Sequence, residues 1–86
     1  MGYRVIYSDR ADATIRKLDR QVAIRILKVM DRVAVLNDPR SIGEALHGDL
    51  RDTWKYRAGD WRIRCTIVDR MLIVEVIEVA HHSTGY

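Results

Sequence analysis

The sequence predicts an α+β fold in which a helical hairpin packs on one face of a small, mostly antiparallel sheet. Three observations support this prediction: a short alternating segment near the N-terminus, two stretches with helical spacing of apolar residues, and three strand-like segments in the second half. The predicted order of elements is β-α-α-β-β-β. At 86 residues the chain is expected to form a single domain, residues 1–86, with no room for a second.

The N-terminal half is predicted to be one strand followed by two helices. Residues 3–7 alternate as a strand does, and residues 9–18 space their apolar side chains to share one helical face. A longer helix is predicted over residues 21–36, because apolar residues recur there at intervals of three and four. Pro39 ends it, since the residue before a proline avoids helical geometry. Residues 40–52 show no clear period, and we predict no regular element there.

The second half is organised around a predicted β-hairpin over residues 54–64, with a two-residue Gly-Asp turn at its centre. Pairing about this turn puts Arg57 opposite Arg62 and Lys55 opposite Arg64. These four cations therefore share one face of the hairpin. The other face carries Trp54, Tyr56, Trp61 and Ile63.

The four cations on one face call for an anionic partner. Like charges directly opposite each other destabilise a strand pair by roughly 0.2–1 kcal/mol. The partner can be a carboxylate on a neighbouring strand or a phosphate group of an external ligand. The net charge of +3 permits binding to nucleic acid or to an acidic protein but proves neither.

The apolar run over residues 71–80 predicts a central strand. With a two-residue turn before it, three pairs are expected: Val68 with Met71, Arg64 with Glu75, and Arg62 with Ile77. This register lets Glu75 neutralise Arg64 but leaves the other three cations without a carboxylate partner. The same parity puts residue 81 on the cationic face.

The composition, 48% hydrophobic and 31% charged, is typical of an ordinary folded domain. The longest apolar runs fall far below the roughly 20 residues that a membrane span needs. No apolar signal region precedes the first strand, so we expect the protein to be cytoplasmic. Cys65 is the only cysteine and lies in a predicted strand, which predicts a buried, inert thiol. No metal site is predicted, because His81 and His82 are adjacent rather than at zinc-site spacing.

Four motifs follow one another along the chain: Asp38-Pro39-Arg40, Leu46-x-Gly48-x-Leu50, Trp54-x-Tyr56-Arg57-x-Gly59-Asp60-Trp61-Arg62 and His81-x-x-x-x-Tyr86. Together with the order of elements, they resemble the RelE/ParE superfamily of bacterial toxins over essentially the whole chain. The resemblance implies a RelE-like fold and an antitoxin encoded beside the toxin. Members with this pattern are usually ribosome-dependent mRNA endonucleases, whereas a ParE branch with the same fold poisons DNA gyrase.

The resemblance also implies which residues form the site. The catalytic candidates are Lys55, Arg57, Arg62, His81, His82 and Tyr86. The candidates for RNA binding are Lys55, Arg57 and Arg62, together with Arg51 and Arg64, which come not from the resemblance but from the cation-rich stretch over residues 51–64. Position 82 departs from the family, because a histidine stands where an arginine is common.

These residue types suit RNA cleavage. The RNA 2′-hydroxyl attacks the adjacent phosphate, so the protein must accept a proton, protonate the leaving 5′-oxygen and stabilise added negative charge. Arginine suits the last task because its donors match phosphate oxygens, and lysine or histidine can act as base or acid. Tyr86 can stack on a splayed base or take part in proton transfer. A plainer explanation also stands: Arg57 and Arg62 could be solvated strand residues, and Arg64 only a partner of Glu75.

We therefore expect an mRNA endoribonuclease that acts on the ribosome without a metal or cofactor. Its expected partners are a RelB-like antitoxin, mRNA on the ribosome and ribosomal RNA, with no membrane partner. One alternative is a ParE-like gyrase inhibitor without nuclease activity, although such a protein needs no acid or base at His81 and Tyr86. Another is a catalytically weakened relative that mainly binds its antitoxin, for which His82 is the argument.

Overall fold

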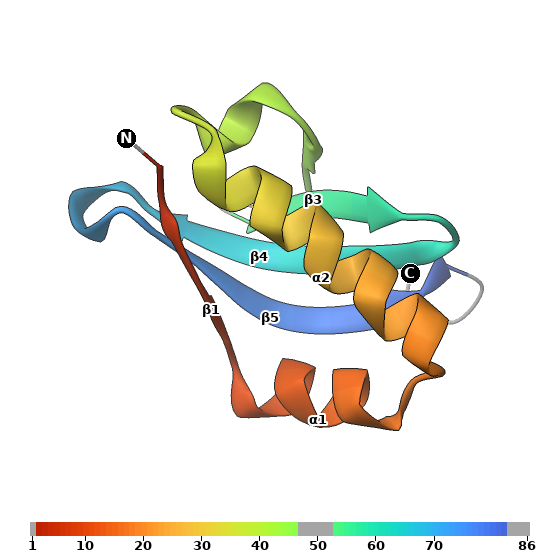
Figure 1. Ribbon diagram of the computed structural model, residues 1–86. Helices are drawn as coiled ribbons and strands as arrows, with labels where there is room; N and C mark the ends of the chain where they lie inside the picture. Colours follow the sequence, from red (N-terminus) through yellow and green to blue (C-terminus); the bar gives the residue numbers. More distant parts are fainter. Residues whose placement is uncertain (1, 47–52, 83–86) are drawn as a thin grey trace.

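The computed structural model describes residues 2–46 and 53–82, and the structural statements below concern these residues. Two α-helices and a five-stranded sheet make up the fold (Figure 1), which confirms the predicted α+β class. The strands are β1 (Arg4–Tyr7), β2 (Glu44–Ala45), β3 (Thr53–Ala58), β4 (Trp61–Val68) and β5 (Ile73–His81). The helices are α1 (Asp9–Lys17) and α2 (Arg20–Val35), with short 3₁₀ turns at Pro39–Ser41 and Asp69–Met71.

The sheet has the strand order β1-β5-β4-β3-β2. β1 runs parallel to β5 and every other neighbouring pair is antiparallel, so the sheet is mostly antiparallel as predicted. α2 lies across one face of the sheet, and α1 lies beside β5 beyond the end of β1 (Figure 1). No helix within residues 2–46 or 53–82 covers the opposite face, which we call the open face.

Both helices begin at a side-chain cap and lie within one residue of their predicted bounds. Ser8 Oγ accepts a hydrogen bond from the Ala11 N–H at 3.0 Å, and Asp19 accepts one from the Gln21 N–H at 3.0 Å. α2 ends at Val35, four residues before Pro39. Of the helices that the structure describes, neither is long and apolar enough to cross a membrane.

The core lies between α2 and the sheet. Its largest fully buried side chains come from both layers: Ile26, Met30 and Val33 of α2, and Tyr56, Ile63, Val74 and Val76 of the sheet. Cys65 is also fully buried, and burial raises the pKa of its thiol far above the ordinary value. The prediction of a buried cysteine is confirmed.

Residues 39–45 contain regular structure that was not predicted, because hydrogen bonds hold them along the edge of β3. The Trp54 indole N–H donates to the Ile42 carbonyl at 2.8 Å, and the Tyr56 hydroxyl donates to the Pro39 carbonyl at 2.6 Å. The two residues of β2 then pair with β3. The prediction of no regular element here was wrong, because a two-residue strand is too short to show any periodicity.

The connection between β4 and β5 is longer than the predicted two-residue turn. It contains a 3₁₀ turn and then Leu72 in the left-handed conformation, with φ of 53°. Val68 consequently pairs with Ile73, not with Met71. A β-bulge beside Arg64 shifts the register by one further residue.

Two further pairs differ from the prediction: Arg64 pairs with Glu78 instead of Glu75, and Arg62 pairs with Ala80 instead of Ile77. A shift of one residue moves side chains to the other face of a sheet. Beyond the bulge it is therefore Glu78 and Ala80 that lie on the open face, and residue 81 does not.

A polar cluster joins the segment before β1, the loop after α2 and the β4–β5 connection. Arg40 donates to both carboxylate oxygens of Asp69, at 2.9 and 3.2 Å, and the Tyr3 hydroxyl donates to the same carboxylate at 2.8 Å. The hydrogen bonds from Arg40 and then from Tyr3 lower the pKa of Asp69 below its ordinary value. The cluster should therefore stabilise the fold only while Asp69 is ionised.

This predicts a pH-dependent effect of Asp69→Asn. A carboxyl group whose pKa is lowered by folding adds stability above its unfolded pKa, and this stability is lost as the pH falls through the folded pKa. In urea unfolding, the variant should be less stable than the wild type at neutral pH, and the difference should shrink at pH values below the ordinary aspartate pKa. A difference that stays constant into strong acid would contradict the assignment.

Candidate functional site

The hairpin of β3 and β4 has the predicted register. Arg57 pairs with Arg62 and Lys55 pairs with Arg64. Gly59 takes a φ of 62° in the two-residue turn, which glycine accommodates without steric cost. The intervening side chains of the two strands belong to the core or pack against it: Trp54, Tyr56, Ala58, Trp61, Ile63 and Cys65. The four cations therefore share the open face, as predicted.

Two of these cations form close ion pairs with carboxylates. Lys55 Nζ lies 3.2 Å from Glu44 Oε1, and Arg64 Nε lies 3.2 Å from Glu78 Oε1. The Lys55 and Arg64 side chains are only 17% and 15% exposed. We call Glu44, Lys55, Arg64 and Glu78 the paired row, because they follow one another across β2, β3, β4 and β5. The predicted partner of Arg64, Glu75, was wrong, and so was the prediction that Lys55 lacks a carboxylate.

Glu44 remains an ionised partner at neutral pH. The hydrogen bond from Lys55 is the main cause that lowers the pKa of Glu44, and the charges of Lys55, Arg57 and Arg62 act in the same direction. Much of the paired row's own charge is therefore neutralised within the sheet. Carboxylates within the protein, one of the two kinds of partner considered from the sequence, therefore account for the paired row.

The next row towards the hairpin turn consists of Arg57, Arg62 and Ala80. We call it the exposed row after Arg57, which is exposed, whereas Arg62 and Ala80 are half-buried. The Arg57 side chain is 63% exposed, and its Nη2 lies 3.8 Å from Glu44 Oε1. The prediction that Arg57 has no carboxylate nearby was therefore also wrong, although the contact is long. Arg62 Nη1 donates only to the Gly59 carbonyl, at 3.4 Å, and forms no ion pair within the described part of the chain.

The end of β5 brings two histidines to the hairpin turn. His81 pairs with Trp61, and the two rings meet edge to face with centroids 5.3 Å apart. Because paired residues share a face, His81 lies on the side of Trp61, and its predicted place on the cationic face was wrong. The β-bulge beside Arg64 is the reason. His82 is exposed, and its backbone N–H donates to the Asp60 carbonyl at 2.8 Å.

The remaining site candidates lie beyond the described segments. Arg51, predicted to bind RNA, and Tyr86, predicted to be catalytic, are outside residues 2–46 and 53–82. Of the other candidates, the structure brings Lys55, Arg57, Arg62 and Arg64 together on one face.

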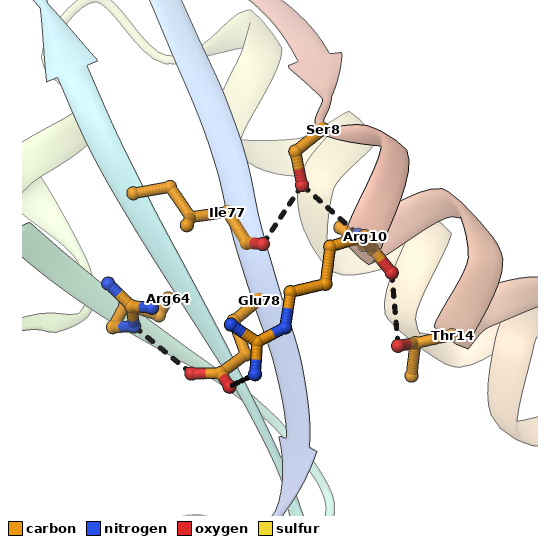
Figure 2. Close-up of polar contacts among 7 residues, drawn as sticks. Ser8, Arg10, Thr14, Arg64, Ile77 and Glu78 are labelled. Carbon is orange, nitrogen blue, oxygen red and sulfur yellow. Dashed lines mark hydrogen bonds and ion pairs between the residues drawn. The ribbon is translucent and has the colours of Figure 1, made fainter.

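Sequence reasoning missed three charged residues that shape this face: Arg10, Glu44 and Glu78. Glu78 could not be assigned without the bulge, and Glu44 could not be assigned without β2. Arg10 contacts Glu78 from α1, 68 residues away in sequence (Figure 2). No pattern among neighbouring residues of the sequence can indicate a contact over such a separation.

The exposed row is suited to bind a phosphate group. Two arginines lie side by side next to a small residue, and guanidinium donors match the oxygens of a phosphate. Within the described residues, no three His, Cys, Asp or Glu side chains gather as a metal site would require. The arrangement favours recognition of an anionic group by direct hydrogen bonds.

The chain is similar to a known family of toxins. A family model described as the ParE toxin of the type II toxin–antitoxin system parDE matches residues 5–86. The chain belongs to this toxin family. It is thus a member of the RelE/ParE superfamily, as the sequence motifs indicated. No curated protein matches the chain.

Solved structures support the same fold. The chain resembles the toxin–antitoxin complex RelBE2 from Mycobacterium tuberculosis with a TM-score of 0.84 and 22% identity, covering 94% of this chain and 92% of that one. It resembles the isolated RelE toxin of E. coli with a TM-score of 0.78 and 26% identity, covering 96% and 87%. A RelE mutant of E. coli in complex with a peptide of the antitoxin RelB matches with a TM-score of 0.73 and 30% identity, covering 92% and 82%.

Proposed function

We propose that this toxin is an endoribonuclease that cleaves mRNA on the ribosome and thereby inhibits translation. The observation that carries the proposal is the exposed row, in which Arg57 and Arg62 lie side by side and, among residues 2–46 and 53–82, a single carboxylate approaches them. Opposed arginines that are left so incompletely neutralised favour an anionic ligand. A phosphate of the RNA backbone meets this requirement.

In the proposed reaction the exposed row stabilises the phosphate. The RNA 2′-hydroxyl is the nucleophile, so the reaction needs no metal-bound water to attack. Arg57 and Arg62 would bind the phosphate oxygens, where negative charge accumulates in the transition state. His82 is exposed beside the hairpin turn and carries an imidazole suited to proton transfer. Lys55 is largely covered and paired with Glu44, which favours a role in supporting Arg57.

A RelB-like antitoxin is the proposed protein partner. Two of the similar structures, from M. tuberculosis and E. coli, are toxins in complex with an antitoxin or an antitoxin peptide. The open face offers such a partner the exposed Arg57 and the half-buried Arg62, so an acidic segment of the antitoxin would complement it. Ribosomal RNA is the proposed further partner, because so small a cationic face gains from a second surface that positions the mRNA.

The test is to induce the toxin without an antitoxin and to pulse-label translation and DNA synthesis in parallel. We expect translation to stop first, with cuts appearing in translated mRNAs. Co-expression of the cognate antitoxin should restore growth. Failure of DNA synthesis while translation continues would contradict the nuclease proposal.

A gyrase inhibitor is the second candidate, because the matching family model is that of ParE. In that case DNA synthesis fails first, and purified gyrase is inhibited in a supercoiling assay. Loss of neither process would favour the third candidate, a weakened relative that binds its antitoxin, and would direct attention to the histidine at position 82.

A further inference from the structure

Arg10 of α1 reaches the open face of the sheet from outside it. Its Nη2 lies 2.6 Å from Glu78 Oε2, while Arg64 Nε approaches the other carboxylate oxygen at 3.2 Å (Figure 2). Glu78 therefore sits between two guanidinium groups, one from the sheet and one from the helix. Arg10 extends the paired row by one residue beyond β5.

The start of α1 is held firmly against β5, which fixes where the Arg10 side chain begins. The Ser8 N–H donates to the Val76 carbonyl at 2.9 Å, and the Ser8 hydroxyl donates to the Ile77 carbonyl at 2.9 Å. The same hydroxyl accepts the capping hydrogen bond from Ala11. Arg10 is two residues beyond Ser8, so its position relative to the sheet is set by backbone contacts as well as by Glu78.

The charges around Glu78 do not cancel. One carboxylate faces two arginines, which leaves a net charge of about +1 in this cluster at neutral pH. Arg64 is only 15% exposed, whereas Arg10 is 69% exposed. A guanidinium has five N–H donors, and Glu78 engages one nitrogen of Arg10. The accessible unused donors of the cluster therefore belong mainly to Arg10.

Arg10 and the exposed row are neighbours on the same face. Glu78 and Ala80 lie on this face of β5, roughly 7 Å apart along the strand. Ala80 pairs with Arg62, so the residue of β5 between Arg62 and the Arg10–Glu78 contact has a small side chain. A bound strand of RNA could cross this surface.

We propose that Arg10 is a further phosphate-binding residue, and that an RNA strand held by Arg57 and Arg62 passes over Ala80 to reach Arg10. This inference rests on the proposed function, because it takes RNA as the ligand of the open face. It adds a residue from α1 to a site otherwise built from strands.

Binding of a fluorescent single-stranded RNA with 2′-O-methyl groups tests the proposal, because this RNA lacks the nucleophile and stays intact. Fluorescence anisotropy at several salt concentrations gives the affinity and its salt dependence. Arg10→Ala should weaken binding about three- to tenfold and reduce the slope of log affinity against log salt by about 0.7. Arg10→Lys should largely restore that slope, since it retains the charge.

Arg16→Ala is the matched control. Arg16 lies on the same helix, is 77% exposed and pairs with Asp12 at 2.9 Å, so the substitution removes the same charge and a comparable ion pair. It should leave RNA binding unchanged. Equal binding by Arg10→Ala and Arg16→Ala would overturn the proposal. A lower melting temperature of Arg10→Ala with an unchanged salt slope would also overturn it, because Arg10 would then be only structural.

The double variant Arg57→Ala/Arg62→Ala separates this inference from the proposed function. If it abolishes RNA binding while Arg10→Ala binds as Arg16→Ala does, only the role of Arg10 is wrong. If the double variant also binds RNA normally, the open face is not the RNA site and both proposals fail.

Discussion

Replacing both arginines of the exposed row, in Arg57→Ala/Arg62→Ala, should abolish toxicity while the protein remains folded. Removal of a single donor that stabilises transition-state charge typically lowers the rate about 100- to 1,000-fold. Both donors are lost here, so cleavage of mRNA on purified ribosomes should fall by at least about 100-fold. Both arginines lie on the open face outside the core, and the loss of like charges opposite each other should not destabilise the sheet.

The control for charge is Arg16→Ala/Arg70→Ala. Both residues are exposed, one on α1 and the other in the β4–β5 connection at the far end of β4 from the hairpin turn. This variant removes the same net charge but should stay toxic. If Arg57→Ala/Arg62→Ala were as toxic as the control, the exposed row would not be the site. If the two variants lost activity equally, overall charge rather than the exposed row would be responsible.

The part of this face that depends on local geometry was predictable from the sequence. A Gly-Asp turn between two alternating segments fixes the register of β3 and β4, and it placed Arg57 opposite Arg62 correctly. The helices were predictable for a similar reason, since their periodicity and caps are local signals. These features required no knowledge of distant residues.

The partners of the cations were not predictable, because they depend on irregular backbone. The longer β4–β5 connection shifts the register by two residues and the bulge beside Arg64 shifts it by one more, so Glu78 rather than Glu75 meets Arg64. The one-residue step at the bulge also turns His81 away from the open face. Glu44 reaches Lys55 only because residues 39–45 are fastened to β3 by Trp54 and Tyr56. Neither the bulge nor the attachment of residues 39–45 to β3 produces a periodic pattern in the sequence.

Gly43→Ala should destabilise the protein through both backbone strain and crowding. Gly43 has a φ of 81°, and a Cβ added there would lie 2.5 Å from the Lys55 carbonyl oxygen and 2.6 Å from Trp54 Nε1. The left-handed conformation alone costs an alanine about 1–2 kcal/mol, and the contact with backbone adds to this. We expect the unfolding free energy to fall by at least about 2 kcal/mol, which lowers the melting temperature by about 8–16 °C.

Gly59→Ala is the matched comparison, because it separates backbone strain from crowding. Gly59 has a similar φ of 62°, but its added Cβ would meet only the flexible end of Arg25, at 2.9 Å. The free energy of unfolding of Gly59→Ala should therefore fall only by the cost of this backbone strain, about 1–2 kcal/mol. If both variants lost the same stability, the crowding at Gly43 would be relieved by a shift of the loop. Such a shift would carry the adjacent Glu44 away from Lys55 and Arg57 and leave these cations free to bind phosphate. Gly43→Ala would then bind single-stranded RNA more tightly than Gly59→Ala. If the two variants were equally stable and also bound RNA equally well, Glu44 would not compete with RNA for these cations.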